Sequence, residues 1–267
     1  MNGPVELGSL ELAAGGTLVL LAALLSLLLV LGLQRTFLLA ATRMVVQLLL
    51  VGLFLRQLFA WSSGWLSAGV VAVMLLAACH EVASRQERRL KQAWHYGVGG
   101  LPVTLATLGI TLFALTSSLK PQPWYDARHL IPLVGIVLGT VMNSASVTLN
   151  HVYGTVSRER QAIEARLTLG ANRYQACHDL LRRSVRAGIL PLLNQMAAAG
   201  IITLPGIMTG QILAGMDPIA AARYQILLLC LLAGGGFLAA CGTAYLAVWR
   251  LTDERDRLRL DRLLAAN

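Results

Sequence analysis

The sequence predicts an all-α, polytopic membrane protein with about seven transmembrane helices. Of its 267 residues 56% are hydrophobic. Only 13% are charged, whereas a soluble domain averages about 25%. The apolar residues also lie in runs near the roughly 20 residues that a helix needs to cross hydrocarbon. The seven runs lie at about 13–33, 38–60, 65–83, 97–118, 130–150, 188–212 and 223–249.

The runs differ in how purely apolar they are. The first four and the last are strongly hydrophobic, and the third stops at His80 and Glu81. The fifth is interrupted by small polar side chains such as Asn143, and the sixth contains Pro191 and Pro205. The fifth and sixth runs are therefore the least typical membrane helices of the seven.

The distribution of basic residues predicts that the N-terminus lies outside and the C-terminus inside. Cytoplasmic segments of membrane proteins are enriched in Lys and Arg. With alternate loops on opposite sides, this orientation places 18 of the 22 Lys and Arg inside. Those left outside are Arg56, Lys120, Arg128 and Arg223. The aromatic residues expected at the outer interface are Trp61, Trp65, Trp124 and Tyr125. The net charge of +9 is thus explained by topology, and no nucleic-acid partner is expected.

One long polar segment, at about 154–187, separates the fifth run from the sixth on the predicted inner side. Its apolar residues recur at helical spacing, for example at Val156, Ile163 and Leu167. Gly170 suits the end of a helix, and Asn172 with Gln175 suits a capping box that starts the next one. The segment is therefore predicted to form a helix, a sharp turn and a second helix outside the membrane.

Two interpretations of this hairpin remain open. A basic amphipathic hairpin could lie on anionic lipid. Alternatively, Glu164-Ala165-Arg166 followed by Gly170 resembles the EAA motif of ABC-transporter permeases, which forms a coupling helix on the ATPase. Arg166 departs from that motif, where an alanine is usual. The residues that this resemblance implies for ATPase coupling are Glu164, Ala165, Arg166, Leu169, Gly170, Ala171, Asn172, Tyr174 and Gln175.

The chain contains no phosphate-binding loop of the form GxxxxGK[ST], and its only lysines are Lys91 and Lys120. Such a loop needs its glycine turn and its lysine to hold a nucleotide. The chain is therefore not expected to be an enzyme or to hold a cofactor. If ATP drives it, ATP and Mg²⁺ bind a partner subunit.

Several stretches are similar to the FetB (YbbM) family of bacterial ABC permeases, over about residues 35–250. They are Ile131–Ile136 with Asn143, Arg166–Ala171, and LPGIMTGQILAGMDP at 204–218 followed by RYQI at 223–226. The resemblance implies one permease domain over 1–267 in the inner membrane, paired with a FetA-type ATPase, two copies of each. It also implies export of a metal, with iron the assigned cargo and resistance to oxidative stress the consequence. Plant relatives are linked to aluminium tolerance.

Polar and helix-breaking residues in the fifth and sixth runs suggest a substrate path. Small and polar residues recur on one face of the fifth run, and unpaired amides in lipid are costly. Packing between helices is the favoured explanation of such a face, and a substrate path or a dimer seam is the alternative. A proline in the sixth run could break that helix and free carbonyls for ions, or merely kink it. The candidate path residues are Asn143, Ser146, Asn150, Asn194, Thr203, Pro205, Gly206 and Met208.

No cluster of residues has the spacing of a metal site, so the metal ligands stay unidentified. Glu81 is better placed to pair with Arg85, four residues on, than to bind metal with His80. The four cysteines form no CxxC and are interpreted as packing residues or free thiols. Because so few potential metal ligands are present, a permease for an organic or nucleotide-sugar cargo remains an alternative.

Two other classes of protein fit the sequence less well. An ion-driven secondary transporter would be expected to carry buried carboxylates, and the predicted spans offer only Glu81, at an inner end. A membrane-embedded enzyme would need several catalytic groups at one depth, which the same scarcity argues against.

Overall fold

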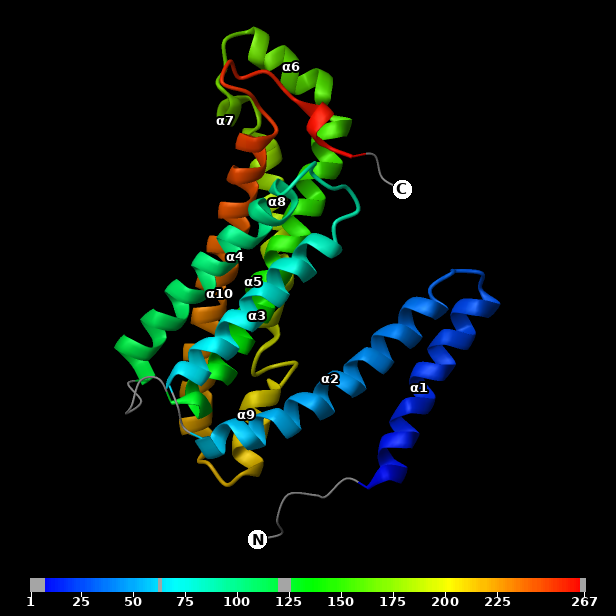
Figure 1. Cartoon of the computed structure of the whole chain (residues 1–267), viewed down its shortest axis with the longest axis vertical. Helices are drawn as coiled ribbons and strands as arrows, with labels where there is room; N and C mark the ends of the chain where they lie inside the picture. Colours follow the sequence, from blue (N-terminus) through cyan, green and yellow to red (C-terminus); the bar gives the residue numbers. More distant parts are fainter. Residues whose placement is uncertain (1–7, 62–63, 120–125, 265–267) are drawn as a thin grey trace. The chain divides into compact units, whose positions relative to one another are not determined.

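The computed structural model describes residues 8–61, 64–119 and 126–264 (Figure 1). The chain divides into two compact units, Met1–Ser62 and Ser63–Asn267, and each is described by itself. Within the described ranges the regular structure is helical, with only isolated β-bridges besides. Lys120, Trp124, Tyr125 and the side chain of Trp61 lie outside the described residues.

The first unit is a hairpin of two apolar helices, α1 (Ser9–Leu28) and α2 (Gln34–Trp61). The turn between them uses left-handed backbone at Val30 and Gly32, with φ of 54° and 72°. The Ser26 hydroxyl accepts a hydrogen bond from the Leu33 amide at 3.0 Å and closes this turn. Most leucines of both helices are exposed, as expected for side chains that face lipid.

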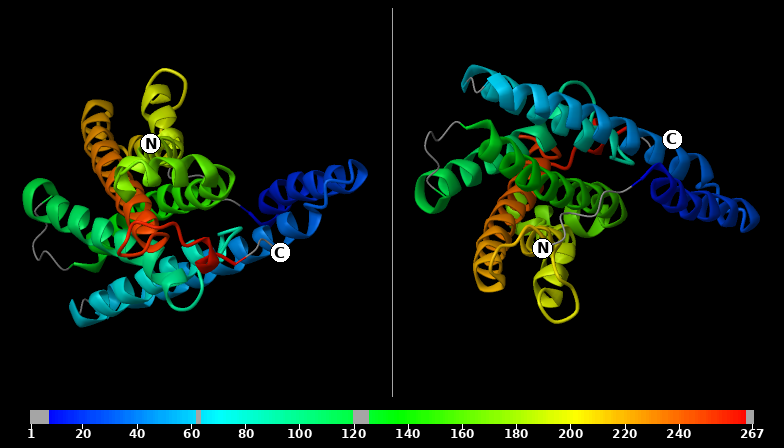
Figure 2. Two further views of the ribbon diagram at one scale, coloured as in Figure 1. Left: turned by 90° about the horizontal axis from the view of Figure 1, so that it is seen from above. Right: turned by 90° about the horizontal axis from the view of Figure 1, so that it is seen from below.

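The second unit is a bundle built around α5 (Ala127–Arg158), which packs against four other helices (Figure 2). These are α3 (Gly64–Ser84), α4 (Trp94–Phe113), α8 (His178–Ala198) and α10 (Pro218–Arg250). A short π-helical turn, Ala114–Leu119, continues α4. The core is rich in small and β-branched residues, and Val98, Val134, Val137 and Val141 are fully buried.

Five helices of the described chain are long and apolar enough to cross a membrane. They span Gln34–Leu58, Gly64–Ser84, Trp94–Ser117, Ala127–Arg158 and Pro218–Arg250. The apolar part of α1, Ala13–Leu28, is shorter. The prediction of an all-α, multi-pass membrane protein is confirmed.

The sixth apolar run, predicted as one helix over 188–212, is divided into two. Helix α8 ends at Ala198, and the short helix α9 (Gly206–Leu213) begins after Pro205. Gly200 turns the chain with a φ of 83°, and Pro205 caps α9. The break therefore covers a seven-residue turn rather than a kink at one proline.

The predicted sequence of helix, sharp turn and second helix is present after α5. Helix α5 has 32 residues and is about 48 Å long, while the hydrocarbon core is about 30 Å thick. It is therefore longer than one crossing requires, and it is followed by α6 (Arg160–Thr168) and the single turn α7 (Arg173–Ala176) (Figure 1). Gly170 ends α6 with a φ of 92°, the left-handed conformation that favours glycine.

The capping box predicted at the start of the second helix is present. The Asn172 side chain accepts hydrogen bonds from the amides of Tyr174 at 3.1 Å and Gln175 at 2.9 Å. The Gln175 side chain accepts one from the Asn172 amide at 3.0 Å. The turn at the tip of the hairpin is thus built by its own local sequence.

Glycines let α8 and α10 approach α5 closely. A Cβ at Gly188 of α8 would lie 2.0 Å from Thr148 Oγ1 and 2.7 Å from the Ser144 carbonyl oxygen. A Cβ at Gly236 of α10 would lie 3.0 Å from Ser144 Oγ. Small residues therefore allow close packing of both helices against α5.

Candidate functional site

The hairpin is held together by ion pairs that link α6 to α8. Arg166 donates to Asp179 Oδ2 at 2.8 Å and to the Ala176 carbonyl at 3.3 Å. Arg183 of α8 pairs with Glu159, at the start of α6, at 2.6 Å. The hydrogen bond from Arg166 lowers the pKa of the Asp179 carboxyl. Arg166, the departure from the EAA motif, therefore joins the two sides of the hairpin.

Replacing Arg166 with leucine is expected to loosen the hairpin. Amides of residues 160–176 should exchange hydrogen faster, as measured by mass spectrometry, because the contact between α6 and α8 is lost. The wild type should show the same change at acidic pH. The pKa of Asp179 is lower in the folded chain than in the unfolded chain. The ion pair with Arg166 therefore stabilises the hairpin at pH values above the unfolded-state pKa. This stabilisation is lost as the pH falls through the folded-state pKa.

The matched control is Arg160→Leu. Among the described residues Arg160 pairs with Glu164 alone, one turn away on the same helix, at 2.8 Å. This variant should leave exchange across the hairpin close to the wild type. Equal exchange in the Arg166 and Arg160 variants would show that the cross-hairpin pair has no structural role.

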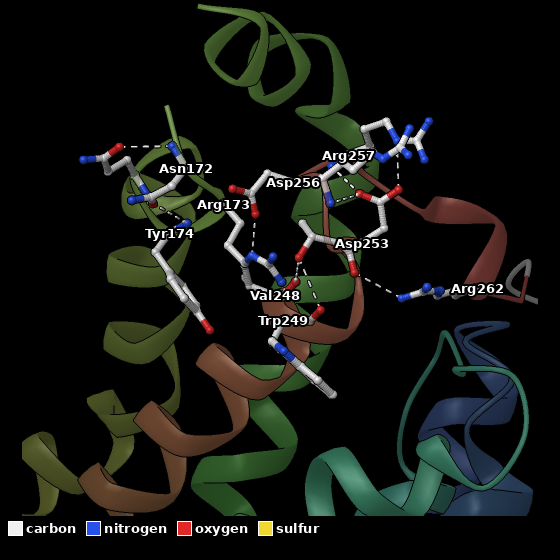
Figure 3. A network of polar contacts seen from close by, with 12 residues as sticks. Asn172, Arg173, Tyr174, Val248, Trp249, Asp253, Asp256, Arg257 and Arg262 are labelled. Carbon is white, nitrogen blue, oxygen red and sulfur yellow. Dashed lines mark hydrogen bonds and ion pairs between the residues drawn. The ribbon is translucent and has the colours of Figure 1, made fainter. Parts of the chain in front are cut away.

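The hairpin is also tied to the end of α10 and to the segment that follows it (Figure 3). Arg173 of α7 forms an ion pair with Asp256, and the Tyr174 ring lies 5.4 Å from the Tyr245 ring of α10. The Asp253 carboxylate accepts hydrogen bonds from the Arg257 amide and side chain, both at 2.8 Å. The first of these bonds is the largest cause of a lowered pKa at Asp253. No pattern in the sequence indicated that this C-terminal segment pairs with α7.

The tip of the hairpin presents an apolar side chain outside the predicted membrane span. Leu169 is 88% exposed, and the neighbouring Gly170 has open space around its Cα. Asn172 is exposed as well, whereas Ala171 is half-buried. The tip therefore carries an exposed leucine beside a turn that the Asn172 capping box holds in place.

A pocket of about 310 Å³ lies between α5 and α8 and contains part of the predicted substrate path. Asn143 of α5 lines it. Gln195 of α8 lines it as well. The neighbouring Asn194 is exposed and does not line the pocket. The full lining is Arg85, Gly139, Thr140, Met142, Asn143, Ser144, Gly188, Pro191, Leu192 and Gln195.

The other predicted path residues of α5 have different environments. Ser146 is buried, and its Oγ has no hydrogen-bond partner among the described residues. Asn150 fixes the turn after α3, because it accepts from the Glu87 amide at 3.1 Å and donates to the Arg85 carbonyl at 3.3 Å. The polar face of α5 therefore serves both a pocket and the packing of the bundle.

Thr203, Pro205, Gly206 and Met208 lie in the break and in α9, at the end of the bundle opposite α6 (Figure 1). None of them lines the pocket between α5 and α8. Two carbonyls at the break accept hydrogen bonds from its own amides: Ala198, the last residue of α8, accepts from the Thr203 amide at 3.1 Å, and Thr203 accepts from the Gly200 amide at 2.8 Å. This part of the predicted path is not brought together with the rest.

No metal site is evident in the part of the chain that the structure describes, where no three His, Cys, Asp or Glu side chains gather. The pairing predicted for Glu81 and Arg85 is confirmed, at 3.1 Å. Arg85 is the charged residue among those that line the pocket between α5 and α8. The four cysteines are free thiols.

Comparisons with known proteins give a consistent assignment. The model of a family described as Uncharacterised protein family (UPF0014) matches residues 9–251. A UPF0014 membrane protein of Synechocystis sp. is 38% identical over 82% of this chain and 84% of its own. The probable iron export permease protein FetB of Escherichia coli is 29% identical over 95% of both chains. Protein ALUMINUM SENSITIVE 3 of Arabidopsis thaliana is 29% identical over 90% of this chain and 85% of its own. No solved structure matches.

Proposed function

The chain belongs to the UPF0014 family, and we propose that it is the membrane-spanning subunit of an ABC transporter, as the name of its relative, the probable iron export permease FetB, suggests. One observation carries this proposal. The hairpin of α6 and α7 joins α5 directly to α8, and the polar pocket lies between the same two helices. A partner that moves the hairpin would therefore change the pocket, as coupling of ATP hydrolysis to transport requires.

We place the whole chain in one permease domain in the bacterial inner membrane, with seven crossings. Five crossings are the long apolar helices, and the other two are α1 and the segment of α8 and α9. The N-terminus is outside and the C-terminus inside, because this orientation puts 18 of 22 basic residues on the cytoplasmic side. The hairpin then faces the cytoplasm.

The partner is a FetA-type subunit that binds Mg²⁺ and ATP, and two copies of each chain form the complex. The exposed tip around Leu169 is the docking element, held by the Asn172 capping box and by Arg166. This chain supplies no nucleotide-binding loop, so ATP hydrolysis is assigned to the partner.

The cargo is a metal ion, and iron is the first choice, because the E. coli relative is named a probable iron export permease. Resistance to oxidative stress would follow from removal of iron from the cytoplasm. Inverted vesicles that contain this chain and its ATPase should accumulate iron only when ATP is present. Vesicles that hydrolyse ATP but accumulate no metal would refute iron as the cargo.

An anionic organic cargo, such as a nucleotide sugar, is the second candidate. The observation in its favour is that Arg85, which also pairs with Glu81, lines the pocket between α5 and α8 while no carboxylate does. An arginine in the lining opposes entry of a bare cation, and it favours an anion that can take the place of Glu81.

Substitution of Arg85 separates the two cargoes. If the cargo is anionic, Arg85→Gln should lower transport about tenfold, while Arg85→Lys, which keeps the charge, should retain most of it. If the cargo is a bare cation, transport by Arg85→Gln should equal or exceed that of the wild type. Uptake of labelled cargo by inverted vesicles measures both.

A further inference from the structure

An apolar groove runs along the flank of the bundle between α4 and α10. Its volume is about 650 Å³, within the range of small-molecule sites. Leu101 and Leu105 of α4 line it and are 55% and 62% exposed. Tyr174, Tyr245 and Trp249 line the groove towards the hairpin. Aromatic residues in such a place are typical of the level where hydrocarbon meets headgroups.

A polar pocket of about 510 Å³ adjoins this groove, and Trp249 lines both. We call it the arginine pocket, after five residues that line it: Arg173, Arg250, Arg255, Arg257 and Arg262. Asp253 and Glu254 are its acidic residues. The groove and the arginine pocket are also connected through α7, because Tyr174 lines the first and Arg173 the second. Figure 3 shows Tyr174 and Trp249 beside the polar network.

Part of the positive charge in the arginine pocket is not neutralised. Arg257 pairs with Asp253, and Arg173 pairs with Asp256. Arg250 and Arg255 pair with no carboxylate in the described part of the chain. The Arg250 guanidinium lies 4.8 Å from the centroid of the Trp94 ring, and its Nε is buried without a hydrogen-bond partner. The arginine pocket therefore has unused donors and an excess of positive charge.

We propose that the groove and the arginine pocket together bind one anionic phospholipid of the inner leaflet. The headgroup phosphate binds Arg250 and Arg255, and an acyl chain lies along α4 and α10 between Leu105 and Leu238. Basic pockets that adjoin membrane helices on the cytoplasmic side suit such headgroups. The charge complementarity favours a lipid over a second copy of this chain, which would bring the same arginines.

The site touches the hairpin that joins α5 to α8. Arg173 and Tyr174 form α7 together with two further residues, so a bound lipid would contact the hairpin on the side facing the membrane. This inference rests on the membrane placement of α4 and α10 and on the proposed orientation. It depends neither on the cargo nor on the partner ATPase.

Native mass spectrometry of the purified chain tests the inference. The probes are phosphatidylglycerol and phosphatidylcholine with identical acyl chains, added at equal concentration. The wild type should retain one phosphatidylglycerol with about thirtyfold preference, since each of the two arginines contributes about 1 kcal/mol. Arg250→Gln with Arg255→Gln should remove the preference. Arg182→Gln with Arg186→Gln, which removes the same charge from α8, should keep it.

A second variant leaves the arginines unchanged, so the test still gives an answer if the arginine double variant does not fold. Leu105→Trp fills the groove from an exposed position and should lower retention of phosphatidylglycerol at least fivefold. Glycerol phosphate, a soluble headgroup, should not displace the lipid. Equal retention of both lipids, an unchanged arginine double variant, or displacement by glycerol phosphate would each overturn the proposal. So would a loss of dimers rather than of lipid in Leu105→Trp. Transport and ATP hydrolysis are not read in this experiment, so its failure leaves the proposed function untouched.

Discussion

Replacing Gly170 with valine is expected to abolish transport and to weaken binding of the ATPase subunit, while the chain still folds. Gly170 has a φ of 92°, which a β-branched residue adopts only with strain of about 1–2 kcal/mol. No atom lies within 4 Å of the position of an added Cβ, so the strain falls on the tip of the hairpin and not on the bundle. Co-purification with the ATPase and uptake by inverted vesicles measure the two effects.

Gly170→Asn is the matched control, because asparagine tolerates the left-handed conformation better than other side chains. It should recover most of the binding and transport that valine removes. A valine variant that binds the ATPase and transports like the wild type would show that the shape of this turn plays no part in coupling.

Replacing Gly188 with leucine is expected to destabilise the whole bundle. The added Cβ would lie 2.0 Å from Thr148 Oγ1 and 2.7 Å from the Ser144 carbonyl oxygen, so α8 must move away from α5. Overpacking of this kind costs about 1–3 kcal/mol or more. The melting temperature of the chain in detergent should fall clearly, and the yield of monodisperse protein should fall with it.

Gly109→Leu provides the comparison, because Gly109 is exposed on α4 and no atom lies within 4 Å of the position of its added Cβ. This variant should melt at or above the wild-type temperature, since leucine also favours the helix. Equal melting of the two variants would contradict the close approach of α5 and α8.

Local sequence predicts the helices and the hairpin tip because their causes are local. The long apolar runs need only their own composition, and the capping box at Asn172 uses side chains within three residues. The division of the sixth run was only partly predictable. Pro205 indicated a break, but the position of the turn also depends on Gly200, which no pattern singled out.

The candidate site was predicted less completely, because it depends on contacts between distant parts of the chain. Periodicity places Asn143, Ser146 and Asn150 on one face of α5, but it does not say which neighbour each one meets. Asn143 lines the pocket, Ser146 is buried, and Asn150 fixes the turn after α3. The ion pair between Arg173 and Asp256 joins residues 83 positions apart, and no local signal indicates it.

The most direct test of the proposed coupling is to purify this chain with a FetA-type ATPase in lipid and to measure ATP hydrolysis with and without cargo. We expect a stable complex whose hydrolysis is stimulated by iron or by the organic anion, and a loss of both complex and stimulation in Gly170→Val. A chain that binds no ATPase, or a complex whose hydrolysis responds identically with and without the hairpin variant, would contradict it.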